Sequence, residues 1–105
     1  MHYDYRYLSE KFSKAVETLA TGTGSIQTRL ADATRVNLLP FRPEELPDDI
    51  RDRVLIIKAR LTSATPKSNE DRLQATVNRM TGYEASEIAS EILSIYENVI
   101  RRDIE

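Results

Sequence analysis

The strongest constraint in this sequence is where its helix-breaking residues stand. Three glycines and four prolines are spread over 105 residues, at Gly22, Gly24, Pro40, Pro43, Pro47, Pro66 and Gly82. Because glycine and proline interrupt regular secondary structure, the long intervals between them are where helices or strands form. Each of these intervals can be compared with a helical period of 100° per residue.

Apolar residues recur in these intervals with the period of an α-helix. In residues 4–21 they fall within an arc of about 140°, and in residues 83–102 within about 160°, with polar side chains elsewhere. No segment alternates with period two, so no β-sheet is expected. The predicted helices cover residues 4–21, 25–38, 47–63, 69–81 and 83–102, with a connector over 39–46.

Capping residues stand where these helices are expected to begin and end. Ser25 is a predicted N-cap, and the spacing of Thr81 and Glu84 is that of a capping box. Gly22 is expected to end the first helix in the left-handed conformation. Pro47 is expected at the first position of the third helix, where its missing N–H costs nothing.

The expected architecture is a single all-α domain, a compact bundle of four to five helices whose neighbours are mostly antiparallel. A chain of 105 residues is enough for one hydrophobic core. The longest apolar run, Val54–Ile57, is far shorter than the roughly 18 residues of a membrane span. Residues 1–6 lack the apolar stretch of a secretory signal, which predicts a cytoplasmic location.

Residue types that carry catalysis or bind metals are scarce. The chain has no cysteine, and its one histidine, His2, follows the first methionine, where we expect it to have no role. Residues 21–25 contain two glycines but lack the lysine of a phosphate loop, and a helical hairpin needs the same residues. Glu87 and Glu91 lie opposite the apolar stripe, as on a solvated face. We therefore predict no enzyme, no metal and no cofactor.

Charge gives little reason to expect a polyanionic partner, since the formal net charge is −2. One cluster of basic residues in the third helix nevertheless keeps a nucleic-acid-associated regulator as the alternative function. A simpler interpretation is that these cations complement the acidic side of the last helix or the helix dipole. The cluster consists of Arg51, Arg53, Lys58 and Arg60.

Several apolar residues lie off the stripes that the core requires. Leu55, Ile56 and Ala59 point roughly 100° or more away from the apolar stripe of the third helix. Either this helix is covered on several sides, or it presents an apolar strip to another chain. Tyr3 and Tyr7, on the polar side of the first helix, form a second candidate interface, with packing over a neighbouring helix end as the alternative.

Residues 19–30, followed by Leu46-Pro47 and then by Met80-Thr81 and Glu84-Ala85, resemble a family of small uncharacterised all-helical bacterial proteins. The resemblance covers most of the chain and implies a bacterial origin and a helical fold, with no known activity to carry over. The function we expect is a non-catalytic helical module for protein–protein contact. Self-association is part of that expectation, with a homodimer as one form.

Overall fold

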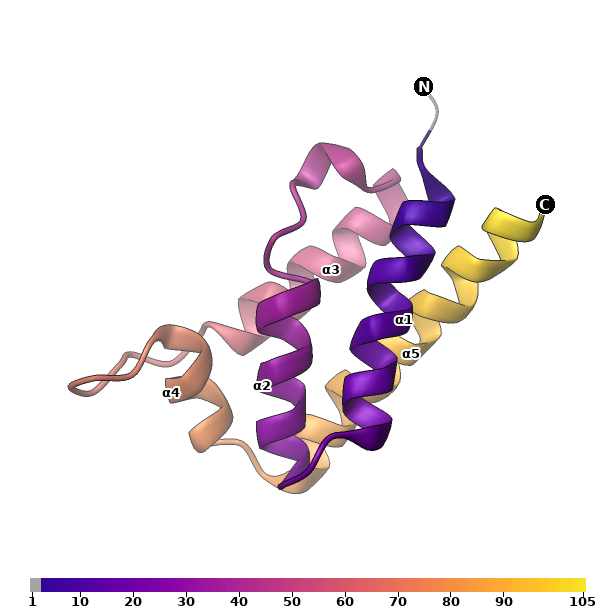
Figure 1. The fold of residues 1–105 in the computed structure, drawn as a ribbon. Helices are drawn as coiled ribbons and strands as arrows, with labels where there is room; N and C mark the ends of the chain where they lie inside the picture. Colours follow the sequence, from indigo (N-terminus) through magenta and orange to yellow (C-terminus); the bar gives the residue numbers. More distant parts are fainter. Residues whose placement is uncertain (1–2) are drawn as a thin grey trace.

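The computed structural model describes residues 3–105, which contain five α-helices and one short 3-10 helix joined by loops (Figure 1). No strand occurs in residues 3–105, so the predicted all-α class is confirmed. In chain order the elements are α1 (Tyr5–Thr21), α2 (Ile26–Asn37), η1 (Pro43–Glu45), α3 (Asp48–Leu61), α4 (Arg72–Asn78) and α5 (Gly82–Ile104).

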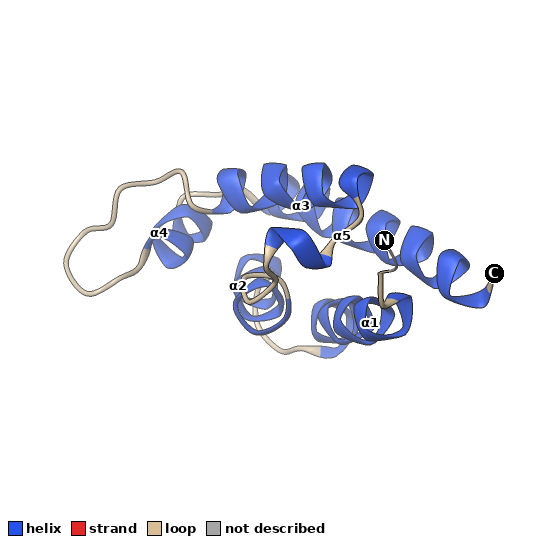
Figure 2. Ribbon diagram, turned by 90° about the horizontal axis from the view of Figure 1, so that it is seen from above, coloured by secondary structure: helices blue, strands red, loops and turns tan. Residues whose placement is uncertain are grey.

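The helices are arranged in two layers, seen edge-on in Figure 2. One layer holds α1 and α2, which form an antiparallel hairpin, and the other holds α3 and α5. The short helix α4 lies at one end of the molecule, beyond α2. The molecule measures 44 × 26 × 19 Å along its principal axes, and α3 lies at its outer edge, which matters for the surface described below.

Apolar side chains from both layers meet in one core. The centre of the apolar stripe of α5 is buried, including Ile88, Ile92 and Ile95. The connector also contributes to the core, since Phe41 is buried and its ring stacks on that of Phe12 with centroids 5.5 Å apart. Burial of apolar surface of this kind is the main force that holds such a bundle together.

Two of the predicted helix caps are present. Ser25 Oγ accepts a hydrogen bond from Thr28 N at 3.1 Å, at the start of α2. Thr81 Oγ1 accepts from Glu84 N at 3.1 Å while Glu84 Oε1 accepts from Thr81 N at 3.0 Å, which completes the capping box of α5. Pro47 is the residue before α3 and not its first residue.

The predicted left-handed conformation of Gly22 is wrong. Its φ is −65° and its ψ is 156°, which any residue adopts, and the left-handed glycine of this turn is Gly24, with φ +92°. Gly22 is required for a different reason, because a Cβ atom at this position would lie 2.6 Å from the carbonyl oxygen of Thr18. The turn between α1 and α2 therefore needs both glycines.

The fourth helix is shorter than its predicted range of 69–81. Asp71 is the N-cap of α4, and its Oδ1 accepts from Gln74 N at 2.8 Å. Glu70 is drawn into the preceding loop, where its Oε1 accepts from Lys67 N at 3.0 Å. Helix α4 therefore begins at Arg72, three residues after the predicted start.

Within residues 3–105, no helix combines the length and apolar content needed to cross a membrane. The same residues hold no group of three or more His, Cys, Asp or Glu side chains placed to bind a metal ion. His2 lies outside the described residues.

Candidate protein-interaction surface

The outer face of α3 carries three exposed apolar residues. The inner face of this helix is buried through Ile50, Val54, Ile57 and Leu61. On the opposite side Leu55 is 43% exposed, Ile56 is 61% exposed, and Ala59 is exposed as well. We call these three residues the α3 ridge. Because α3 lies at the edge of its layer, neighbours cover it on one side only, and the interpretation of a fully enveloped helix does not hold (Figure 2).

Two of the four cations in the candidate basic patch are held in ion pairs within the chain. Arg53 Nε donates to Glu91 Oε1 at 2.6 Å and its Nη2 donates to Ser94 Oγ at 2.9 Å, which joins α3 to α5. Arg51 Nη2 donates to Asp48 Oδ1 at 2.7 Å, one turn earlier in the same helix. The pair between Arg53 and Glu91 agrees with the interpretation that cations of the third helix complement the acidic side of the last helix.

The other two cations differ in their surroundings. Lys58 Nζ donates to the carbonyl oxygen of Phe41 at 3.1 Å, and burial lowers the pKa of this ammonium below its ordinary value. Arg60 is exposed and forms no ion pair with any of residues 3–105. A surface that binds nucleic acid needs several cations free to reach phosphates, and here only Arg60 of the four meets that requirement.

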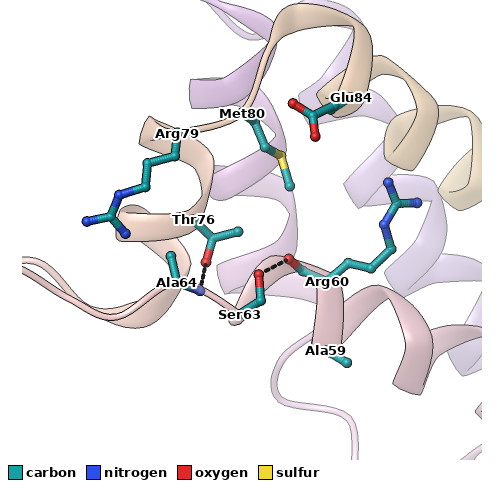
Figure 3. Close-up of a pocket in the computed structure, with 8 residues that line it drawn as sticks. All are labelled: Ala59, Arg60, Ser63, Ala64, Thr76, Arg79, Met80 and Glu84. Atoms are coloured by element: carbon teal, nitrogen blue, oxygen red, sulfur yellow. Dashed lines mark hydrogen bonds between the residues drawn. The ribbon is translucent and has the colours of Figure 1, made fainter.

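A hollow of about 570 Å³ adjoins the α3 ridge at the C-terminal end of α3 (Figure 3). Both apolar and charged side chains line it, and the Met80 side chain points into it. The guanidinium groups of Arg60 and Arg79 lie on opposite sides of the hollow, so they do not converge on one anion. The residues that line it are Ala59, Arg60, Ser63, Ala64, Thr76, Arg79, Met80 and Glu84.

A groove of about 340 Å³ lies between α3 and α5 and shares Arg60 with the hollow. Its α3 wall carries the cations Arg53 and Arg60, and its α5 wall carries the carboxylates Glu87 and Glu91. Ile56 belongs both to the ridge and to this groove. The outer face of the α3–α5 layer therefore combines an apolar ridge with two walls of opposite charge.

The two tyrosines of the second candidate interface pack within the chain. The ring of Tyr7 meets Phe41 edge-to-face, with centroids 6.0 Å apart, and the side chain is 40% exposed. Tyr3 makes an edge contact with Tyr5 at 6.4 Å. Neither tyrosine lines the hollow or the groove beside the α3 ridge.

One exposed apolar position was assigned to the core by its helical period. Leu93 belongs to the predicted apolar stripe of the last helix, yet it is 44% exposed. It lines a groove of about 250 Å³ between α1 and α5, together with Val16 and Ile26. The stripe is wide enough that its edge extends beyond the covering helices, and the sequence alone shows no sign of where that edge falls.

No family model matches this chain, and neither a curated protein nor a solved structure matches it. Of what the resemblance implies, the helical fold is confirmed by the structure, and the bacterial origin stays a prediction.

Proposed function

We propose that this protein is a non-catalytic helical module of the bacterial cytoplasm that acts through protein–protein contact at the α3 ridge, and that it self-associates. The observation that carries the proposal is the pair of adjacent, exposed aliphatic side chains Leu55 and Ile56 on the face of α3 opposite the core. Burying a large aliphatic side chain completely contributes about 1.5 to 3 kcal/mol, so covering these two half-exposed side chains is favourable.

Two ion pairs within the chain, close to the ridge, support self-association. Arg51 is paired with Asp48, and Arg53 with Glu91, inside the chain. These pairs reduce the repulsion between like charges when the α3–α5 faces of two copies meet. No second function is proposed, because the cations of the basic patch that the nucleic-acid alternative requires are mostly held by partners within the chain.

The test compares the oligomeric state of the wild type with that of the double variant Leu55→Glu/Ile56→Glu. Sedimentation velocity over about 10 to 200 µM should give a dimer or larger species for the wild type, a range in which weak self-association is visible. The double variant should remain helical by circular dichroism and sediment as a monomer, because charges on the ridge oppose its burial.

A matched control places the same charges on apolar residues outside α3. Val36 and Ile104 are 63% and 81% exposed, so Val36→Glu/Ile104→Glu should keep the wild-type mass. A wild type that stays monomeric at every concentration refutes the self-association. Loss of helical structure in the ridge variant means that Leu55 and Ile56 belong to the core, which refutes their role as an interface.

A further inference from the structure

The groove between α3 and α5 is electrostatically asymmetric across its width. Arg53 and Arg60 stand on the α3 wall, facing Glu87 and Glu91 on the α5 wall. One charge from each wall is already used within the chain, in the pair between Arg53 and Glu91. Arg60 and Glu87 are exposed, and neither forms an ion pair with any of residues 3–105. Each wall thus offers one charge to a partner.

A surface of this kind is complementary to itself. In a symmetric dimer the same patch is used by both copies, related by a two-fold axis in the plane of contact. An axis that runs along the groove exchanges its walls, so the cationic wall of one copy faces the anionic wall of the other. An axis across the groove instead sets like charges against each other, which costs several kcal/mol.

The size of the face suits such a dimer. A stable interface buries about 800 Å² on each partner, which is about an eighth of the 6255 Å² accessible surface of this chain. One face of a molecule that measures 44 by 26 Å can provide this area. Ile56 stands on the α3 wall of the groove and is 61% exposed, so an axis along the groove covers it with the α5 wall of the second copy.

We infer that the partner of the α3 ridge is a second copy of this chain, related by a two-fold axis along the groove between α3 and α5. Arg60 of each copy then pairs with Glu87 of the second copy, and Ile56 of each copy is covered by the α5 wall of the second copy. This inference rests on the proposed function, since it names the occupant and the orientation of the same surface.

The experiment reverses each charge separately and then mixes the two variants. In Arg60→Glu both cross-dimer contacts become acidic pairs, and in Glu87→Arg both become basic pairs. Either change should raise the dimer Kd at least about tenfold. When the two variants are mixed, each heterodimer contains two restored ion pairs. The mixture should therefore dimerise within about threefold of the wild-type Kd, with heterodimers predominating in native mass spectrometry.

Matched controls change the same charges on α1, in the other layer of the molecule. Lys14→Glu and Glu10→Arg, at two exposed positions, should leave the dimer Kd at its wild-type value. Together they show whether net charge alone accounts for the effect of the groove variants.

The outcomes separate this inference from the function on which it rests. If the ridge variant Leu55→Glu/Ile56→Glu is monomeric while the charge reversals leave the Kd unchanged, the ridge is an interface but the two-fold arrangement is wrong. A mixture no tighter than the separate variants also overturns the arrangement. If the wild type never dimerises, both the self-association and this inference fail.

Discussion

At the scale of single residues, the three glycines of this chain differ in whether the backbone requires a glycine. Gly22 is needed because the Thr18 carbonyl oxygen passes close to where a Cβ would be, and Gly24 because its φ is +92°. Gly82, the first residue of α5, has neither constraint, since an added Cβ would meet only Ile26 Cγ2 at 3.9 Å. Glycine at this position costs conformational entropy on folding without a compensating steric need.

The substitutions Gly22→Ala and Gly82→Ala should therefore change stability in opposite directions. A Cβ at position 22 would lie 2.6 Å from the Thr18 carbonyl oxygen, so Gly22→Ala should lower the free energy of unfolding by at least about 1 kcal/mol. Gly82→Ala should raise it by about 0.5 kcal/mol, because alanine reduces the entropy of the unfolded chain. Urea unfolding monitored by circular dichroism measures both values, and equal effects at the two sites would contradict this account.

At the scale of elements, α5 begins at a capping box and is joined to α3 by polar side-chain contacts. The hydrogen bonds from Thr81 N and from the Thr81 side chain lower the pKa of Glu84. Further along, Arg102 on α5 holds both carboxylate oxygens of Asp49 at the start of α3. Bidentate pairs of this kind add geometric specificity to the packing of the two helices.

Removal of the cap should destabilise the whole domain. Thr81→Ala eliminates the hydroxyl that accepts from Glu84 N and should lower the free energy of unfolding by about 1 kcal/mol. Thr81→Ser keeps the hydroxyl and is the matched control, expected to stay close to the wild type. Chemical denaturation of the wild type and both variants measures the free energy of unfolding. An equal decrease in both variants would mean that the methyl group of Thr81, and not its hydroxyl cap, stabilises the domain.

The pair between Asp49 and Arg102 should make stability depend on pH. The hydrogen bond from Arg102 lowers the pKa of Asp49 in the folded protein. A carboxyl whose pKa is lower in the folded than in the unfolded state stabilises the fold above its unfolded value, near 4, and this contribution is lost as pH falls through the folded value.

Asp49→Asn should therefore be less stable than the wild type at pH 7, by about 0.5 kcal/mol because the pair is partly exposed to solvent. The difference should shrink toward zero as the pH falls below about 3. Arg102→Gln removes the same pair from the other side and should show the same pH dependence in thermal unfolding. A deficit in either variant that persists undiminished at the lowest pH would show that the pair is not its cause.

At the scale of the whole molecule, the two-layer arrangement decides which helix faces are covered. The inner faces of both layers close one core, and α3 at the edge keeps an outer face that no other helix covers (Figure 2). Leu55 and Ile56 therefore remain exposed although they lie in the middle of a well-packed helix. A second copy that covers them would link folding to association.

The thermal stability of the wild type should accordingly depend on its concentration. Because a dimer binds the folded state only, Tm should rise by a few degrees between about 5 and 200 µM protein. The variant Leu55→Glu/Ile56→Glu should unfold at the same Tm at both concentrations. Differential scanning calorimetry measures this, and a wild-type Tm that does not move with concentration would contradict self-association in this range.

Most of the secondary structure could be predicted from the sequence, because the signals for it are local. The five helices follow from breaker positions and apolar period, and the caps at Ser25 and Thr81 form from residues three apart in the chain. The left-handed conformation belongs to Gly24 and not to Gly22, and the two glycines stand in one turn where the apolar period does not distinguish them. The start of α4 was misplaced because Glu70 bonds to the loop and not to the helix.

Only part of the candidate surface could be predicted from the sequence. The sequence by itself determined that the chain is all-α, and that Leu55, Ile56 and Ala59 lie off the core stripe of their helix, since both follow from the helical period. Only the tertiary structure decided that these residues stay exposed, that Arg53 pairs with Glu91, and that Tyr7 packs on Phe41. The reason is physical, because the period orients side chains around one helix, whereas burial and pairing depend on which other helices lie beside it.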